Sequence, residues 1–402
     1  MFRLSPLLRH RAAFALLPVV ALVATGCDAV KKLPFVGTKA TPAPPVVRAS
    51  VAPPPPPQID YAKVRPNELG KIPVVMYHDI GGIPPKREDG LHRSVAAFEQ
   101  DLKLLYDAGF RPVNMGDVLA GKIDVPAGKS PVVITFDDAR ESQFRLTETA
   151  TEQRIDPQCG LGVLQAFHKK HKDWGLKATF FALPKGPKTA DAFKQVGKGD
   201  EKLQYLVANG FEIGNHSLNH RDMSRMTPAQ IQAEIGGAHN SLMTAAPEAK
   251  IAVVALPMGK FPKDKANLKY LTAGTADGKS YAYEGAMLAA YRPVDSPFNK
   301  AFDPLRMERI APYDKDPNGL RNWIVKLSAS SGGRFVSDGD AQTVSYPQGE
   351  QAQVNTARIE KAGLRTNPYV PFGGTSGAKP IVGAGDDSPA KADTPKPIVP
   401  AQ

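Results

Sequence analysis

The chain has 402 residues, of which 42% are hydrophobic and 23% charged, so it can bury a core and is not disordered throughout. Its net charge of +11 includes three arginines in the first 26 residues, and no Lys/Arg run alternates with aromatic residues, which argues against a nucleic-acid partner. Two cysteines are too few for a disulfide scaffold or for a cysteine-based zinc finger.

The first 26 residues have the pattern of an export signal. Three arginines precede an apolar stretch over residues 12–23, which is too short to span a membrane comfortably and is followed by small residues before Cys27. The ending resembles a bacterial lipobox, so we predict a lipoprotein signal peptide over residues 1–26 and lipidation of Cys27. Ordinary secretion, with Cys27 as a free thiol, is the alternative. We expect the protein in the cell envelope, anchored in the membrane and facing the periplasm or the cell exterior.

Proline-rich and low-complexity segments flank the part of the chain that can fold. Residues 27–70 include the run Pro53 to Pro57 and are predicted to form an extended linker. The folded domain is expected over residues 71–335. Residues 336–402 are expected to be a C-terminal extension that is mostly a low-complexity tail.

Strands and helices alternate through the centre of the chain. Short apolar or β-branched runs predict strands near residues 72–77, 132–136, 177–181, 211–213 and 251–256. Helical spacing of apolar residues predicts helices near residues 98–105, 164–174 and 203–207. This alternation is typical of an α/β protein with a parallel sheet, either closed as a barrel or open. Functional residues are then expected at the carboxyl ends of the strands.

Chemically reactive side chains follow several of these strands. Asp137 and Asp138 end the second strand, and neighbouring side chains of an extended segment point in different directions, so the two can serve different roles. His216 and His220 follow a later strand, and their spacing would place them on one face of a helical turn. Two histidines and one carboxylate make a three-ligand metal site with open positions. His78 ends the first strand and is a weak signal alone.

Four motifs together carry a family resemblance. TFDD, ATFF, EIGNHSLNH and a Pro-x-Gly turn, in this order, resemble the polysaccharide deacetylases of carbohydrate esterase family four, also called the NodB-homology domain, over roughly residues 71–313. The early YHDI resembles the circularly permuted branch of exported poly-N-acetylglucosamine deacetylases. The resemblance implies a distorted (β/α)₇ barrel, a divalent metal with Zn²⁺ as first choice, and removal of N-acetyl groups from N-acetylglucosamine polymers by hydrolysis of a linear amide.

The resemblance also implies roles for six residues. It makes Asp138, His216 and His220 the metal ligands and Asp137 the general base that activates water. The backbone N–H of Met258, in the Pro-x-Gly turn, would help to hold the oxyanion. No histidine follows His239, so His78 would be the acid that protonates the leaving amine.

The sequence departs from the family pattern in three places, one of them Met258, which stands where an aromatic residue is usual. Ala255 stands where the family has an arginine that orients the base, and Arg140 is a possible substitute. The connection over residues 139–175 is longer than usual and contains Cys159, which we expect to be buried or unreactive. We slightly favour a substrate-shaping role for this insertion over that of a passive loop.

Alternatives to an N-deacetylase stay open on the sequence alone. The same site could act as an O-deacetylase on acetylated xylan or another glycan. A lipoprotein that binds glycan without turnover, or a metal site with a purely structural role, is also compatible with the motifs. The expected partners are an amino-sugar polysaccharide and the membrane, and the expected oligomeric state is a monomer.

Overall fold

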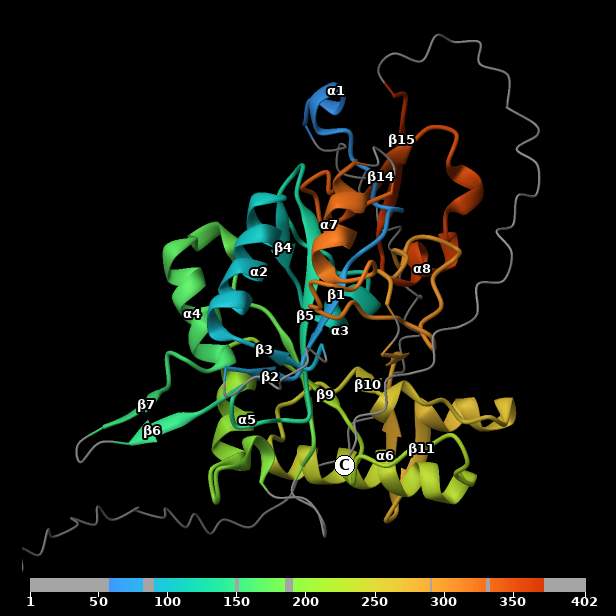
Figure 1. Ribbon diagram of the computed structural model, residues 1–402. Helices are drawn as coiled ribbons and strands as arrows, with labels where there is room; N and C mark the ends of the chain where they lie inside the picture. The colour runs from blue at the N-terminus through green and yellow to red at the C-terminus, as the bar shows by residue number, and fades with distance from the viewer. Residues whose placement is uncertain are drawn as a thin grey trace, which may run out of the picture. The chain divides into compact units, whose positions relative to one another are not determined.

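The computed structural model describes residues 58–81, 90–148, 152–184, 191–289, 291–329 and 333–371 (Figure 1). The predicted signal peptide, Cys27, the proline run and the chain after residue 371 lie outside the described residues. The boundaries expected at residues 71 and 335 both fall inside the described part. Among the described helices, none combines the length and the apolar character that crossing a membrane requires.

A curled parallel sheet forms the centre of the fold. Its strands run in the order β1 (Val74–Tyr77), β5 (Ser130–Asp137), β8 (Thr179–Ala182), β9 (Glu212–Asn215), β10 (Val253–Ala255) and β13 (Gly285–Met287), and β4 (Phe110–Pro112) pairs with the start of β5. Parallel bridges from Met287 to Met307 and from Val75 to Ile310 place residues 307–310 between β13 and β1. The sheet therefore curls into a distorted (β/α) barrel, which confirms the predicted fold class.

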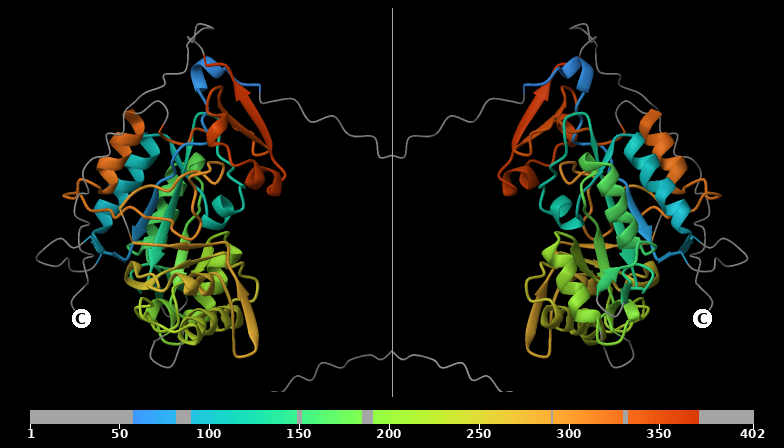
Figure 2. Two further views of the ribbon diagram at one scale, coloured as in Figure 1. Left: turned by 90° about the vertical axis from the view of Figure 1, so that its right-hand side faces the viewer. Right: turned by 90° about the vertical axis from the view of Figure 1, so that its left-hand side faces the viewer.

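Helices cover the outside of this sheet. They are α2 (Val95–Asp107), α4 (Gly160–Lys170), α5 (Gly199–Ala208), α6 (Pro228–Ala245) and α7 (Leu320–Ala329). Helix α3 (Met115–Leu119) packs on the other face of the sheet, in the apolar cluster that contains Val74 and Val133. Figure 2 shows α7 beside α2, in agreement with their contacts. The local sequence explains the starts of two of them. Ser94 caps α2 by accepting the Ala97 N–H at 3.1 Å, and Thr227 forms a capping box with Gln230 ahead of α6.

Shorter elements complete the fold around the barrel. They are α1 (Tyr61–Val64), α8 (Thr356–Lys361), and the strand pairs β2 (Asp79–Ile80) with β3 (His92–Arg93), β6 (Leu146–Glu148) with β7 (Gln153–Ile155), β11 (Ala273–Ala276) with β12 (Lys279–Ala282), and β14 (Thr343–Pro347) with β15 (Arg365–Tyr369). The β6–β7 hairpin lies in the long connection over residues 139–175 (Figure 1). Cys159 is buried at the start of α4, as expected.

The two ends of the described chain meet at the amino end of β5. The Asn67 N–H donates to the Val336 carbonyl at 2.9 Å, and the next residue, Ser337, donates to the carbonyl of Lys129 at 2.9 Å. Lys129 directly precedes β5. The ring centres of Tyr61 and Tyr369 lie 5.0 Å apart. The segment that precedes the barrel in the sequence therefore packs against the segment that follows it.

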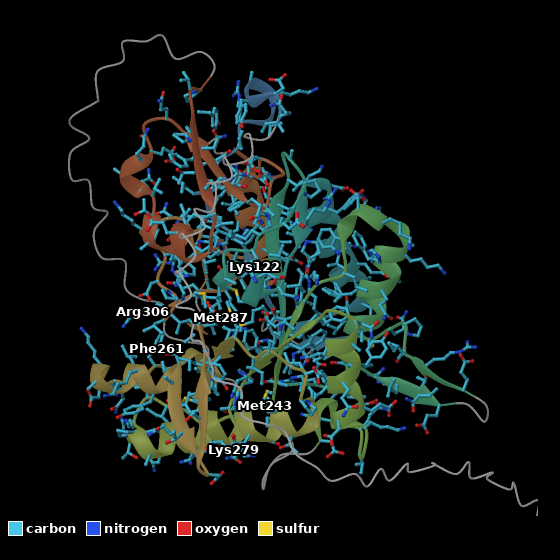
Figure 3. The ribbon with its side chains drawn as sticks, turned by 180° about the vertical axis from the view of Figure 1, so that it is seen from behind. Lys122, Met243, Phe261, Lys279, Met287 and Arg306 are labelled. Carbon is cyan, nitrogen blue, oxygen red and sulfur yellow. The ribbon has the colours of Figure 1, made fainter. Side chains whose placement is uncertain are left out.

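Side chains from distant loops also meet at the other end of the strands. The loop after β10 contains Phe261, and the loop after β13 contains Arg306. The Arg306 guanidinium carbon lies 5.2 Å from the centre of the Phe261 ring (Figure 3). This cation–π contact ties the two loops together.

Buried Glu212 makes the stability of the fold sensitive to pH. At the start of β9 it accepts the Thr179 hydroxyl at 2.5 Å and the Gly116 N–H at 2.9 Å, and burial raises its pKa from 4.5 to about 7. The folded state therefore binds this proton more tightly than the unfolded state. Its contribution to stability is complete below pH 4.5 and is lost as the pH rises to 7.

Replacing Glu212 by Gln is expected to flatten this dependence, because an amide does not ionise. Its oxygen can accept the Gly116 N–H, and its NH₂ group can donate to the Thr179 hydroxyl oxygen. Between pH 4.5 and 8 the wild type should lose about 3 kcal/mol relative to the variant. Urea unfolding at several pH values measures the difference. Glu99→Gln, at an exposed position on α2, is the control, and its stability should depend on pH as that of the wild type does. Parallel wild-type and Glu212→Gln curves would contradict the prediction.

Candidate functional site

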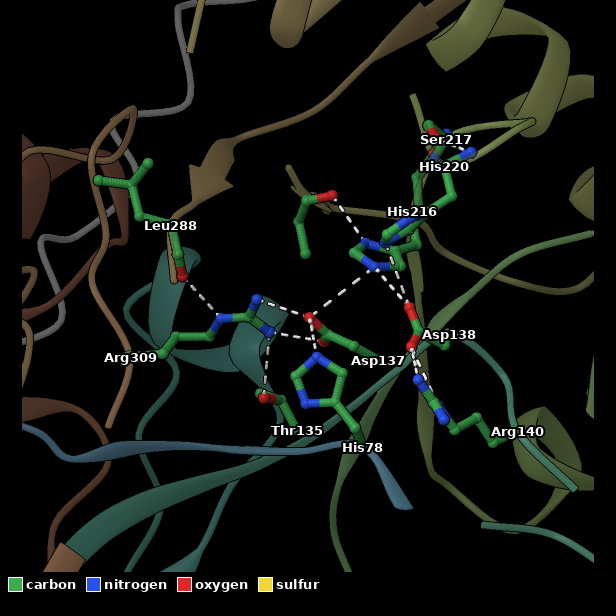
Figure 4. A network of polar contacts seen from close by, with 12 residues as sticks. His78, Thr135, Asp137, Asp138, Arg140, His216, Ser217, His220, Leu288 and Arg309 are labelled. Carbon is green, nitrogen blue, oxygen red and sulfur yellow. Dashed lines mark hydrogen bonds and ion pairs between the residues drawn. The ribbon is translucent and has the colours of Figure 1, made fainter. Parts of the chain in front are cut away.

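The carboxyl ends of neighbouring strands bring the predicted residues to one pocket (Figure 4). His78 follows β1, Asp137 ends β5 and Asp138 comes directly after it. His216 follows β9, and Met258 follows β10 in a short turn. His220 lies four residues beyond His216, and all six side chains line the pocket.

Three of these residues form a cluster of potential metal ligands. Asp138 Oδ1 lies 3.2 Å from His216 Nε2 and 3.3 Å from His220 Nε2. The three ligand atoms all lie within 4.8 Å of one another. Asp138 Oδ1 and His216 Nε2 are buried and make no hydrogen bond, which is costly unless another group satisfies them. This donor set, two imidazoles and one carboxylate oxygen, fits a divalent cation of the zinc type.

The segment that holds the two histidines is not the helical turn expected from their spacing. Ser217 and His220 have φ values of 67° and 52°, so the chain passes twice through the left-handed region. Asn215 Oδ1 accepts the Ser217 N–H at 2.7 Å, and Ser217 Oγ accepts the His220 N–H at 3.0 Å. Local hydrogen bonds thus replace the helix and still aim both Nε2 atoms at Asp138.

The ring of His216 is oriented by the backbone of β10. Its Nδ1 lies 2.9 Å from the carbonyl oxygen of Ala255, so this nitrogen carries the proton and donates it. The Nε2 lone pair is then free to face Asp138, which is the arrangement that a metal-binding imidazole requires. Ala255, at the position where the family has an arginine, therefore contributes its backbone to the site.

A buried arginine that the sequence analysis missed holds Asp137. Arg309 Nη1 and Nη2 donate to Asp137 Oδ1 and Oδ2 at 2.6 and 2.7 Å, and Arg309 Nε donates to the carbonyl of Leu288 at 2.8 Å. Both charged side chains are about 98% buried or more. Arg140, suggested by the sequence for this role, lies instead at Asp138. The sequence feature that could have pointed to Arg309 is its place between the apolar residues Met307 and Ile310, which suggests a partly buried arginine.

Arg309 decides the charge of Asp137. Burial alone would raise the pKa of this carboxyl, but the charges of Arg309 and His216 outweigh burial and hold the pKa below its ordinary value. Asp137 is therefore ionised at neutral pH. It makes no short contact with the cluster, since its Oδ2 lies 3.9 Å from His216 Nε2. It is thus available to accept a proton.

His78 faces Asp137 from the end of β1. Its Nε2 lies 3.9 Å from Asp137 Oδ2, while its Nδ1 is buried without a hydrogen-bond partner. Burial lowers the pKa of His78 despite the opposing effect of Asp137. Gln143 Nε2 donates to the His78 carbonyl at 2.6 Å and also to that of Asp137, which fixes the two strand ends side by side.

Apolar side chains complete the wall of the pocket. They include Leu91, Leu256 and Met258, and the aromatic rings of Tyr291 and Tyr313 lie among them. Met258 lies in a short 3₁₀ turn with φ of 56°, another left-handed residue at the edge of the site. Aromatic rings beside polar groups suit a sugar ring, which has both apolar faces and hydroxyl groups.

A parallel α/β barrel with an ionised carboxylate, a histidine and a candidate cation site at its strand ends defines a class of barrel hydrolases. Comparison with known proteins narrows this class. Residues 124–273 match the family model described as polysaccharide deacetylase. This match and the curated deacetylase relatives described next support a polysaccharide deacetylase domain in this chain, that is, a hydrolase.

Two curated relatives and two solved structures illustrate the similarity. The putative polysaccharide deacetylase YxkH of Bacillus subtilis is 22% identical over 59% of this chain and 75% of its own length. The chitooligosaccharide deacetylase of a Bradyrhizobium species is 27% identical over 45% of this chain and 71% of its own. The Streptococcus pyogenes deacetylase PplD in complex with acetate is 18% identical, with 65% and 99% covered and a TM-score of 0.47. IcaB from Ammonifex degensii is 21% identical, with 63% and 97% covered and a TM-score of 0.43.

Proposed function

We propose that this deacetylase removes N-acetyl groups from a polysaccharide that contains N-acetylglucosamine, using a divalent cation, first of all Zn²⁺. One observation carries the proposal: the ligand atoms of Asp138, His216 and His220 converge beside Asp137, a buried and ionised carboxylate, and those of Asp138 and His216 are buried without a hydrogen bond. A cation bound there would lower the pKa of water and polarise the acetyl carbonyl.

The protein's own residues divide the remaining work. Asp137, held by both nitrogens of the Arg309 fork, accepts the proton of the attacking water. The backbone N–H of Met258 donates to the carbonyl oxygen as negative charge develops on it. His78, in its protonated form, gives a proton to the leaving amine, which cannot depart as an anion; burial of the ring makes this form a stronger acid. Tyr291 and Tyr313 line the pocket and would flank the sugar ring.

The acid role of His78 predicts a dependence on the leaving group. Changing His78 to Gln is expected to reduce amide hydrolysis by about a hundredfold or more. Hydrolysis of an activated phenyl acetate should fall much less, because a phenolate leaves without a proton. Steady-state rates on both substrates measure the contrast. Equal losses on the amide and the ester would show that His78 is not the acid.

Metal content and acetate release together test the proposal. The purified protein should hold one ion per chain by elemental analysis and release acetate from N-acetylglucosamine oligomers. Acetate from acetylated xylan alone would indicate the O-deacetylase. A bound ion without turnover of any glycan would indicate a binding protein. If the protein shows no turnover and its melting temperature falls sharply when a chelator removes the ion, the metal has a structural role. A chain that binds no Zn²⁺ would refute the site.

We further propose that the protein is a lipoprotein of the cell envelope. This rests on the basic and apolar pattern of residues 1–26 and on Cys27, which lie outside the described residues. A diacyl or triacyl group on Cys27, found by mass spectrometry of the mature N-terminus, is the expected result. A free Cys27 thiol in a secreted protein would refute it.

A further inference from the structure

Asp138 presents its two carboxylate oxygens to different partners. Oδ1 faces His216 and His220, whereas Oδ2 accepts two hydrogen bonds from Arg140, from Nε at 3.1 Å and from Nη2 at 2.9 Å. Figure 4 shows the Arg140 fork on the side of the carboxylate away from the histidines. One oxygen is thus engaged before any ion arrives.

The backbone between the two residues is shaped for this contact. Asp138 and Ala139 have φ values of 76° and 45°, a left-handed pair that folds Arg140 back onto a carboxylate only two residues earlier. Neither residue is a glycine, so the conformation is strained and must be held by its surroundings. Asp137 on one side is fixed by Arg309, and the fork of Arg140 fixes the turn on the other.

Arg140 is itself held from the opposite side. Its Nη1 lies 3.5 Å from Asp79 Oδ2, and Ser142 Oγ donates to Asp79. Arg140 is 30% exposed at the pocket, whereas the Asp138 side chain is 13% exposed. The guanidinium therefore has a defined position between two carboxylates and does not swing freely at the surface.

We propose that Arg140 is a positioning residue that restricts Asp138 to one-oxygen ligation and thereby keeps a coordination position open for water or the acetyl oxygen. The proposal rests on the metal site proposed above. A carboxylate with both oxygens free can bind an ion through two atoms, and the Arg140 contacts oppose that mode. The positive charge of Arg140 also weakens the attraction between Asp138 and a cation, so an open site is obtained with lower affinity.

Cobalt substitution tests this proposal without any need for turnover. Co²⁺ replaces Zn²⁺ in such sites, and its visible absorption weakens as the coordination number rises. In Arg140→Ala, the freed oxygen of Asp138 should join the ligands, so the Co²⁺ absorption should lose intensity. The Kd for Co²⁺, measured by competition with a chelator, should fall about tenfold, because a ligand is gained and the nearby positive charge is removed. Because the open position is lost, kcat should fall about tenfold or more, with KM changed less.

Matched variants separate positioning from general support. Arg145→Ala is the control, because Arg145 lies in the same connection and is similarly exposed, but pairs with Glu141 and Asp156 and does not line the pocket. Its cobalt spectrum should equal that of the wild type. Arg140→Lys keeps the charge and one donor, so it should restore part of the wild-type spectrum and kcat.

Each remaining outcome decides against the proposal or against the site itself. An unchanged spectrum in Arg140→Ala, with Co²⁺ bound, would overturn the positioning role and leave the proposed function intact. Weaker binding of Co²⁺ with a lower melting temperature of the ion-free protein would show that Arg140 only supports the fold. A wild-type chain that binds no Co²⁺ or Zn²⁺ would refute the metal site on which both proposals stand.

Discussion

Asp137→Asn is expected to lower acetate release by at least about a thousandfold while the ion content stays at the wild-type level. The amide cannot accept a proton at neutral pH, yet it has nearly the volume of the carboxylate. Asp137 lies outside the ligand cluster, so the ion should remain. Single-turnover acetate assays and elemental analysis measure the two quantities. Loss of the ion together with activity would move Asp137 into the ligand set.

A second buried aspartate provides the control for this variant. Asp101 is buried like Asp137 and is held by Arg93, whose Nη2 donates to it at 2.6 Å. Asp101→Asn disturbs a similar ion pair outside the pocket and should reduce stability while keeping most of kcat. Similar rate losses in the two variants would show that the effect of Asp137→Asn comes from weakened folding and not from a missing base.

Arg309→Met is expected to change both stability and the pH profile. It leaves Asp137 buried without a counter-charge, which should cost about 3–5 kcal/mol of folding free energy. The pKa of Asp137 should rise, because only the charges of His216 and His78 then oppose the effect of burial. The acid limb of the pH–rate profile should therefore move to higher pH. Urea unfolding and kcat measured from pH 5 to 9 test the two effects.

A double variant isolates the cause of the lost stability. Asp137→Asn combined with Arg309→Met removes both charges, so much of the stability lost in Arg309→Met should return. Arg309→Lys, which retains the charge but lacks the fork, should show a smaller shift of the acid limb. A pH profile that does not move in Arg309→Met would contradict the assignment of Asp137 as the base.

The sequence predicted the strands and their chemistry better than it predicted long-range partners. Runs such as residues 132–136 are β-branched and apolar, and they appear in the structure as buried strands followed by the Asp pair. Arg309 could not be assigned, because its contact with Asp137 joins residues 172 apart and depends on barrel closure through residues 307–310. No local pattern encodes that closure.

Two further differences have local physical causes. The His216–His220 spacing suggested a helix, but side-chain hydrogen bonds of Asn215 and Ser217 compete with helical ones and turn the chain differently. Residues 336–402 were expected to be mostly a low-complexity tail, because of the composition after about residue 367. Val344, Tyr346 and Ile359 nevertheless pack on the apolar cluster that includes Leu69. A few buried residues are enough to fold such a segment onto an existing core.

The meeting of Tyr61 with Tyr369 has a geometric consequence for access by a polymer. Both lie beyond the amino end of β5, whereas Asp137 ends the same strand seven residues on, roughly 23 Å away. Chain segments that continue past either end of the described fold therefore attach at the pole opposite the pocket. A glycan that enters the pocket would therefore not meet these points of attachment.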